Sequence, residues 1–144
     1  MNGVKMSDCR FYVNEEKRTV ICVIPNTSEM LVDFILEHFV WDSIDFWRAL
    51  GGRFYRVDLK MPHSFVGKAV CADEDEWNEE TGKLIAFSRA KDKCYKSFFK
   101  RANKFVQAVD VKLGDMIGLF NDFGLKLENK RELLQAEIDE RTKA

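Results

Sequence analysis

The longest regular pattern of hydrophobic and polar positions runs from Asn78 to Asp110 and has the period of an α-helix. At about 100° per residue its apolar residues gather on one side, with Ser88 as the one small polar member. This predicted core-facing stripe consists of Leu84, Ser88, Tyr95, Phe98, Phe99, Ala102, Phe105, Val106 and Val109. The opposite side carries the basic ridge, defined as Arg89, Lys93, Lys96, Lys100 and Lys104 with Arg101 at its edge. The pattern therefore predicts a helix with one packed face and one positively charged face.

The pattern stays helical beyond this stretch, but from Val111 to Leu127 apolar residues cover most of the circumference. A helix that is apolar nearly all round is buried within its own chain or in an interface. Gly114 and Gly124 predict a kink or break near each position, because glycine weakens a helix by about 1 kcal/mol. The last segment, from residue 127 to about residue 141, is amphipathic again, with Leu127, Leu134 and Ile138 on one side.

The first half of the chain has the alternation and β-branched composition of strands. Cys9–Val13 and Thr19–Ile24 are predicted strands joined by a polar turn, and the second has no polar face, which places it inside the sheet. Arg53–Met61 alternates as a half-buried strand, and Phe65–Cys71 forms a fourth. Within that fourth strand Gly67 indicates a bulge or a close backbone approach.

Two short helices are expected between these strands. Thr27 or Ser28 can cap a helix that continues to about Phe39, with Met30, Leu31, Phe34, Ile35 and His38 on its inner side. Asp42 or Ser43 can cap a second helix, which Gly51-Gly52 would end. Before the long helix, the acidic run at residues 73–76 lacks the spacing of a calcium loop, so Asp75 or Asn78 is expected to cap that helix.

These elements predict one α+β domain over residues 1–144. Residues 9–76 form mainly an antiparallel sheet of about four strands with two short helices, and residues 77–144 form long amphipathic helices. The hydrophobic content of 46% and the aromatic content of 12% suit a compact core. The net charge of −1 points to no particular partner, although 33% of residues are charged.

A cytoplasmic location is expected, because the chain has no apolar run of about 18 residues and no signal-peptide pattern at its N-terminus. The four cysteines are widely separated and have no histidine at ligand spacing. Reduced, mostly buried thiols are therefore expected, with no metal and no cofactor.

A non-catalytic protein is expected, because the sequence lacks a nucleophile elbow, a phosphate-binding glycine loop and an HExxH motif. The alternative is a hydrolase that uses Cys71, paired with His63 near a strand end, or the acidic cluster.

Two groups of residues are candidates for binding. The basic ridge could neutralise phosphates of DNA or RNA, or it could be the solvated side of an amphipathic helix. Large apolar residues could form a partner interface or complete the core, and the candidates are Trp41, Trp47, Phe54, Ile117 and Phe120. A homo-oligomer that assembles through residues 111–127 is a further alternative.

The segment from Gly67 to Ala90 resembles a pattern found in small uncharacterised proteins of Gram-positive phages and prophages. In that pattern a strand carries G-x-A-x-C, an acidic turn follows, and a helix opens with glycine and continues as L-A-x-x-R-A. The matching positions are Gly67, Ala69, Cys71, Asp75, Gly82, Ala86, Arg89 and Ala90, and Ile85 replaces the leucine before Ala86.

The resemblance covers about a sixth of the chain and implies context only, since the family assigns no activity and no catalytic residue. It implies a phage accessory protein in the host cytoplasm that binds and inhibits or retunes a host complex. Anti-CRISPR and other anti-defence inhibitors are similar in size and in lacking a recognisable active site, so the implied partner is a host protein or a nucleoprotein complex.

Overall fold

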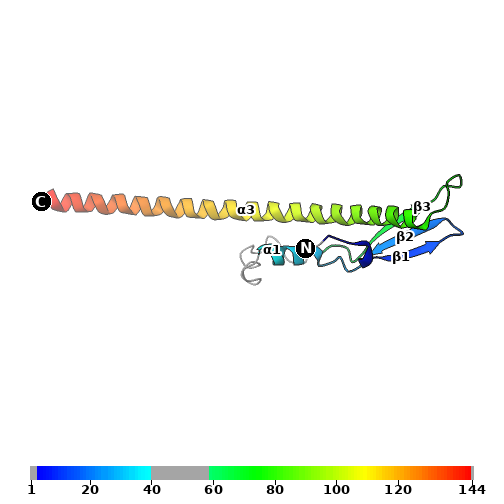
Figure 1. Ribbon diagram of the computed structural model, residues 1–144. Coiled ribbons are helices and arrows are strands. Elements are labelled where there is room, and N and C mark those ends of the chain that lie inside the picture. The colour runs from blue at the N-terminus through cyan, green and yellow to red at the C-terminus, as the bar shows by residue number, and fades with distance from the viewer. Residues whose placement is uncertain (1–2, 40–58, 144) are drawn as a thin grey trace. The chain divides into compact units, whose positions relative to one another are not determined.

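The computed structural model describes residues 3–39 and 59–143, and the chain divides into two compact units, Met1–Val106 and Gln107–Ala144. The first unit contains a 3-10 turn η1 (Met6–Asp8), strands β1 (Arg10–Asn14) and β2 (Thr19–Ile24), helix α1 (Met30–Phe39) and strand β3 (Phe65–Val70). Helix α3 (Glu79–Lys143) begins in this unit and continues through the second. Within the first unit, the three strands lie beside the first turns of α3 (Figure 1).

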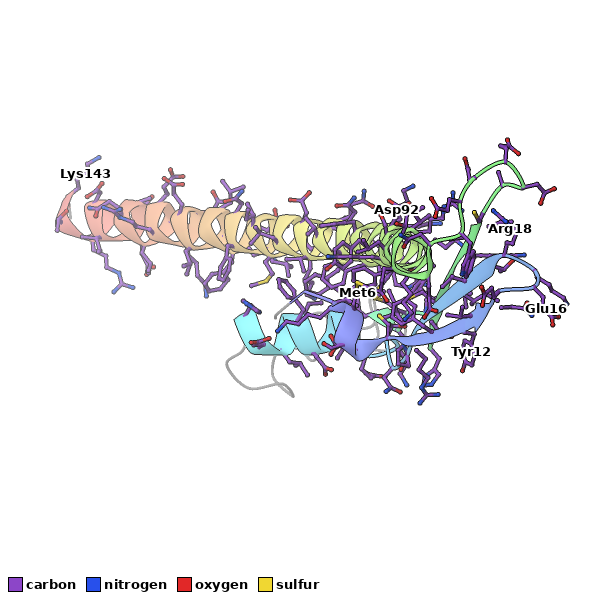
Figure 2. All side chains as sticks on the ribbon, turned by 45° about the vertical axis from the view of Figure 1, so that its right-hand side comes forward. Met6, Tyr12, Glu16, Arg18, Asp92 and Lys143 are labelled. Atoms are coloured by element: carbon purple, nitrogen blue, oxygen red, sulfur yellow. The ribbon has the colours of Figure 1, made fainter. Side chains whose placement is uncertain are left out.

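The three strands form one antiparallel sheet in the order β1-β2-β3. The register pairs Cys22 of β2 with Phe11 of β1 on one side and with Gly67 of β3 on the other. β2 has a paired strand on each side, so the prediction that this strand lies inside the sheet is confirmed. Val20, Cys22 and Ile24 alternate along it and are buried. On the opposite face of the sheet, Tyr12, Val66 and Val70 are exposed, and Figure 2 shows Tyr12 pointing away from α3.

The described residues contain three strands, whereas about four were expected from the sequence. Most of the predicted strand Arg53–Met61 and all of the predicted helix after Asp42 lie outside the described residues. At the end of that predicted strand, residues 59–61 are not a strand. Leu59 and Met61 are buried, and the Met61 N–H donates to the Ser28 carbonyl (2.8 Å). These residues join the core from a loop beside α1.

Helix α1 ends at Phe39 as predicted and packs against α3. It begins at Met30, and the Thr27 hydroxyl, a predicted cap, instead donates to the Pro62 carbonyl. Leu31, Val32 and Ile35 are buried in the core. The rings of Phe34 and Phe98 meet edge to face with centroids 5.6 Å apart, a favoured aromatic geometry. His38 stacks on Phe34, and its Nδ1 lies 3.0 Å from the Phe34 carbonyl, so this histidine sits at the rim of the core.

The buried side of α3 differs from the predicted stripe. It consists of Ala86, Ala90, Cys94, Phe98 and Phe105, with Tyr95 and Ala102 partly buried. Leu84, Ser88, Phe99, Val106 and Val109 are exposed, so their placement in the core was wrong. The pattern gave most weight to large apolar residues, but the side that meets the sheet is built from small ones.

Gly67 explains why small residues are required there. A Cβ added at Gly67 would lie 1.9 Å from the Ala86 carbonyl oxygen and 2.5 Å from the Ala90 nitrogen, both backbone atoms. The backbones of β3 and α3 therefore come together with no side chain between them. The prediction of a close backbone approach at Gly67 is confirmed, and alanine at 86 and 90 completes the contact.

The start of α3 follows the sequence, but its continuation does not. Asn78 caps the helix, since its Oδ1 accepts the Thr81 N–H at 2.9 Å. Of the kink or break expected near Gly114 and near Gly124, the break is wrong, because α3 is one helix from residue 79 to residue 143. Glycine costs a helix about 1 kcal/mol, which is less than the loss of the local hydrogen bonds that a break would require. No helix in the described ranges is both long and apolar enough to cross a bilayer.

Candidate interaction surfaces

Among the described strands β3 lies at the edge of the sheet, and the first two members of the basic ridge, Arg89 and Lys93, lie along that edge. The Arg89 Nη1 donates to the Lys68 carbonyl (2.7 Å) and the Lys93 Nζ donates to the Val66 carbonyl (2.8 Å). An edge strand has backbone groups with no neighbouring strand to bond them, and such an edge can recruit other chains. Arg89 and Lys93 cover two of these carbonyls from the helix that packs beside the strand.

The remaining members of the ridge have mixed environments. The Arg101 Nε donates to the Lys60 carbonyl (2.8 Å), which ties the loop before β3 to the helix. Lys96 pairs with Asp92 one turn earlier (2.8 Å), and its side chain is 77% exposed. Lys100 and Lys104 are exposed. The ridge thus stabilises the fold through three of its six members and presents three lysines to solvent.

The candidate interface residues fall in two places. Trp41, Trp47 and Phe54 lie outside the described residues. Ile117 and Phe120 lie on the part of α3 in the second unit and are 52% and 69% exposed. They were predicted to be buried or to lie in an interface, and within the described chain they are uncovered.

The second unit exposes large apolar side chains along its whole length. Each of them is at least 36% exposed, and the set comprises Val109, Val111, Leu113, Met116, Ile117, Leu119, Phe120, Phe123, Leu125, Leu127, Leu133, Leu134 and Ile138. A Cβ added at Gly114, Gly118 or Gly124 would meet no atom within 4 Å. The described part of this unit is one helical segment whose large apolar side chains are exposed.

A small cleft lies in the first unit, between the end of β3 and the start of α3. Its volume is about 370 Å³, and Cys71, Trp77, Thr81 and Ile85 are among the residues that line it. Sequence analysis missed Arg18, which contacts the loop that contributes Cys71 and Asp75 to the lining of this cleft.

Arg18 holds the loop that follows β3. Its Nη2 donates to the Ala72 carbonyl (2.8 Å) and to the Asp75 carbonyl, and it lies 3.1 Å from the Cys71 Sγ. The Cys71 N–H in turn donates to the Arg18 carbonyl (2.9 Å). Figure 2 shows Arg18 at the end of the sheet beside this loop. In the sequence, the acidic run at residues 73–76 hints that a basic side chain lies near this loop. Arg18 contacts backbone carbonyls of the loop, however, and composition does not reveal such a contact.

Cys9 and Cys22 lie within hydrogen-bonding reach of each other, and Cys94 lies in the same core, whereas Cys71 lies apart from His63. His63 precedes β3 and Cys71 follows it, so six strand residues and a span of roughly 20 Å separate them. Burial raises the pKa of Cys22 to about 12 and also raises the pKa of Cys9 and of Cys94. These three thiols are therefore neutral at physiological pH. No group of three potential metal ligands comes together in the part of the chain that the structure describes.

Comparisons with protein-family models, with curated proteins and with solved structures return no match to this chain. The surfaces above are thus the observations on which a function can be proposed.

Proposed function

We propose that this chain is a non-catalytic interaction protein that binds another protein chain through the apolar side chains of its second unit. The observation that carries the proposal is their exposure, which ranges from 36% at Val109 to 72% at Leu133. Together they expose on the order of 1,000 Å² of apolar surface, more than the few hundred Å² that a monomer normally leaves uncovered. Patches of this size mark surfaces that bind another macromolecule.

The stability of the helix supports the same proposal. Most of the stability of a protein helix comes from packing of its apolar side and little comes from intrinsic propensity. Gly114, Gly118 and Gly124 together cost about 3 kcal/mol relative to alanine. A partner that covers the apolar side chains would supply the packing energy that this helical segment lacks by itself.

The basic ridge gives weaker support to nucleic-acid binding. Arg89, Lys93 and Arg101 donate to backbone carbonyls of the first unit. Side chains held in this way must leave those carbonyls before they can bind a phosphate, which lowers the net gain. Binding of DNA or RNA through Lys96, Lys100 and Lys104 is therefore the second candidate function.

The resemblance to small phage proteins supports a biological context for this binding. In that context the chain would act in the host cytoplasm, where it would inhibit or retune a host protein or nucleoprotein complex. The resemblance contributes no binding residue, so the proposal assigns the contact to the apolar side chains alone.

The test compares two double variants of the full chain with the wild type. The first replaces apolar residues of the second unit, Ile117→Asp with Phe120→Asp, and the second reverses ridge charges, Lys96→Glu with Lys100→Glu. Association is measured by light scattering of the chain alone, by capture from host lysate, and with short duplex DNA and RNA at low and moderate salt.

The first variant is expected to lose protein association and the second to retain it, with similar thermal stability of the first unit in both. The proposal is wrong if the wild-type chain remains monomeric and captures the same proteins as the first variant. A salt-sensitive complex with nucleic acid that is lost only in the ridge variant would instead establish the second candidate.

A further inference from the structure

The exposed apolar residues of the second unit contain a seven-residue repeat. Successive members alternate in spacing between four and three residues, and two of them are separated by seven. We name this set the heptad face, and it consists of Val109, Leu113, Met116, Phe120, Phe123, Leu127 and Leu134. Lys130 occupies the one polar position within the repeat. A spacing that averages 3.5 residues places all of these side chains along one side of a helix.

The apolar residues off this face are interrupted. Val111 and Leu125 lie on the opposite side of the helix, where Gly118 and Glu132 share the same heptad position. Gly114 also lies outside the heptad face, and Gly124 lies at the flanking position that Ile117 occupies one heptad earlier. A face with a sustained repeat next to others without one indicates that only the heptad face was shaped for helix packing.

We infer that the heptad face is covered by the heptad face of a second copy of this chain, forming a coiled coil between the two second units. The inference rests on the proposed function and deepens it by naming the partner. A repeat of 3.5 residues matches the geometry in which two helices wind around each other with a continuous contact, and the same repeat on both partners keeps that contact in register. A second copy brings the matching repeat.

The exposed area is sufficient for such a dimer. The seven residues of the heptad face are between 36% and 69% exposed. They would bury roughly 700 Å² per chain, close to the 800 Å² per partner of a standard stable interface. Ile117, Leu119, Leu133 and Ile138 flank the face and would add to this area.

The charges of the second unit permit self-association. Residues 107–144 contain six basic and eight acidic residues, so two copies carry little net repulsion. In the ordinary coiled-coil arrangement, charged residues lie beside the apolar core and remain in water. Lys130 is the exception, since its repeat position faces the partner helix, and it lowers stability while limiting the registers that the two helices can adopt.

The decisive experiment uses matched substitutions in the full chain, with a reductant present to keep the cysteines as thiols. Leu113→Glu with Leu127→Glu changes the heptad face, and Val111→Glu with Leu125→Glu places the same two charges on the opposite side of the same helix. Leu127 and Leu125 are two residues apart and are 52% and 59% exposed, which makes them a close pair. Mass is measured by light scattering over a wide range of concentration.

The wild type is expected to have a mass of at least twice the 16.8 kDa of one chain. The heptad-face variant should raise the dissociation constant on the order of 100-fold or more, because two charges per chain would be buried between the helices, while the opposite-face variant should change it less than about threefold. Equal weakening by both variants would overturn the inference.

A gain-of-function variant guards against misfolding as the cause of any loss. Lys130→Leu completes the repeat and is expected to lower the dissociation constant about tenfold or more, whereas Glu132→Leu adds a leucine off the face and should not. No tightening by Lys130→Leu would count against the heptad face.

The outcomes separate this inference from the proposed function. The wild type could be monomeric at every concentration and yet capture a different protein that the heptad-face variant does not capture. In that case the inference that the partner is a second copy is wrong, and the proposed function as an interaction protein is retained. If the wild type is monomeric and the heptad-face variant alters no capture, both are wrong.

Discussion

Replacing Gly67 with alanine is the sharpest test of how the first unit is built. The added Cβ would lie 1.9 Å from the Ala86 carbonyl oxygen and 2.5 Å from the Ala90 nitrogen. Ordinary contact begins near 3.4 Å, so the strand and the helix must separate by about 1.5 Å. Both obstructing groups are backbone, and no side-chain rotation can relieve the clash.

The expected effect of Gly67→Ala is a loss of about 3 kcal/mol or more in the free energy of unfolding. Inserting one methyl group into a packed core typically costs 1–3 kcal/mol, and the upper end applies where the neighbours are rigid. Alanine would by itself favour the strand by about 0.5–1 kcal/mol over glycine, which is smaller and of opposite sign. The steric term therefore decides the outcome.

Urea unfolding followed by circular dichroism and by tryptophan fluorescence measures this loss. Gly114→Ala is the matched control, because a Cβ there meets nothing within 4 Å and should stabilise the helix by about 1 kcal/mol. A loss below about 1 kcal/mol in Gly67→Ala would refute the close packing of β3 on α3.

Three further predictions follow from burial and contacts. Phe98→Ala should lower the free energy of unfolding by about 3 kcal/mol or more and Leu84→Ala by less than about 1 kcal/mol, because Phe98 is 8% and Leu84 57% exposed. Equal losses in urea unfolding would instead support the buried stripe that was predicted from the sequence. Burial raises the pKa of Cys22 from 9.0 to about 12, so the contribution of this thiol to the free energy of unfolding is present below pH 9 and is lost as the pH rises toward 12. The loss amounts to at most about 1.4 kcal/mol per pH unit, and Cys22→Ala should reduce this pH dependence. An unchanged pH dependence of the free energy, measured by urea unfolding at pH 8 to 11, would contradict the burial of Cys22. Arg18→Ala should release the loop after β3 and speed the reaction of Cys71 with a thiol reagent at least severalfold, whereas an unchanged rate would show that Arg18 does not hold the loop.

Hydrophobic patterning located most of the described elements. The β-branched run of β2 was found with its bounds and its central place, because an apolar run without a polar face is typical of a strand inside a sheet. Only one face of β2 is fully buried, and the other is half-buried. Asn78 was one of two predicted caps, with Asp75, because a side-chain oxygen at either position can satisfy amide groups of the first turn, and the structure selects Asn78. These features depend on neighbours within a few residues, which the sequence contains.

The candidate surfaces could be predicted only in part. The basic ridge was visible from the spacing of its residues, but its hydrogen bonds to the carbonyls of Val66 and Lys68 depend on the strand that lies beside the helix. Arg18 was overlooked, since its guanidinium group meets backbone atoms more than fifty residues away. Backbone groups are the same in every residue, so no pattern of side chains indicates such a contact.

The sequence by itself determined the α+β class, the order of the described elements and the presence of a highly apolar helical segment. The tertiary structure decided which side of α3 is buried, because the close approach at Gly67 selects Ala86 and Ala90 over larger apolar residues nearby. It also decided that the apolar residues beyond residue 107 remain exposed in the described chain. Periodicity shows which residues share a face of a helix, but burial depends on what the rest of the fold brings against that face.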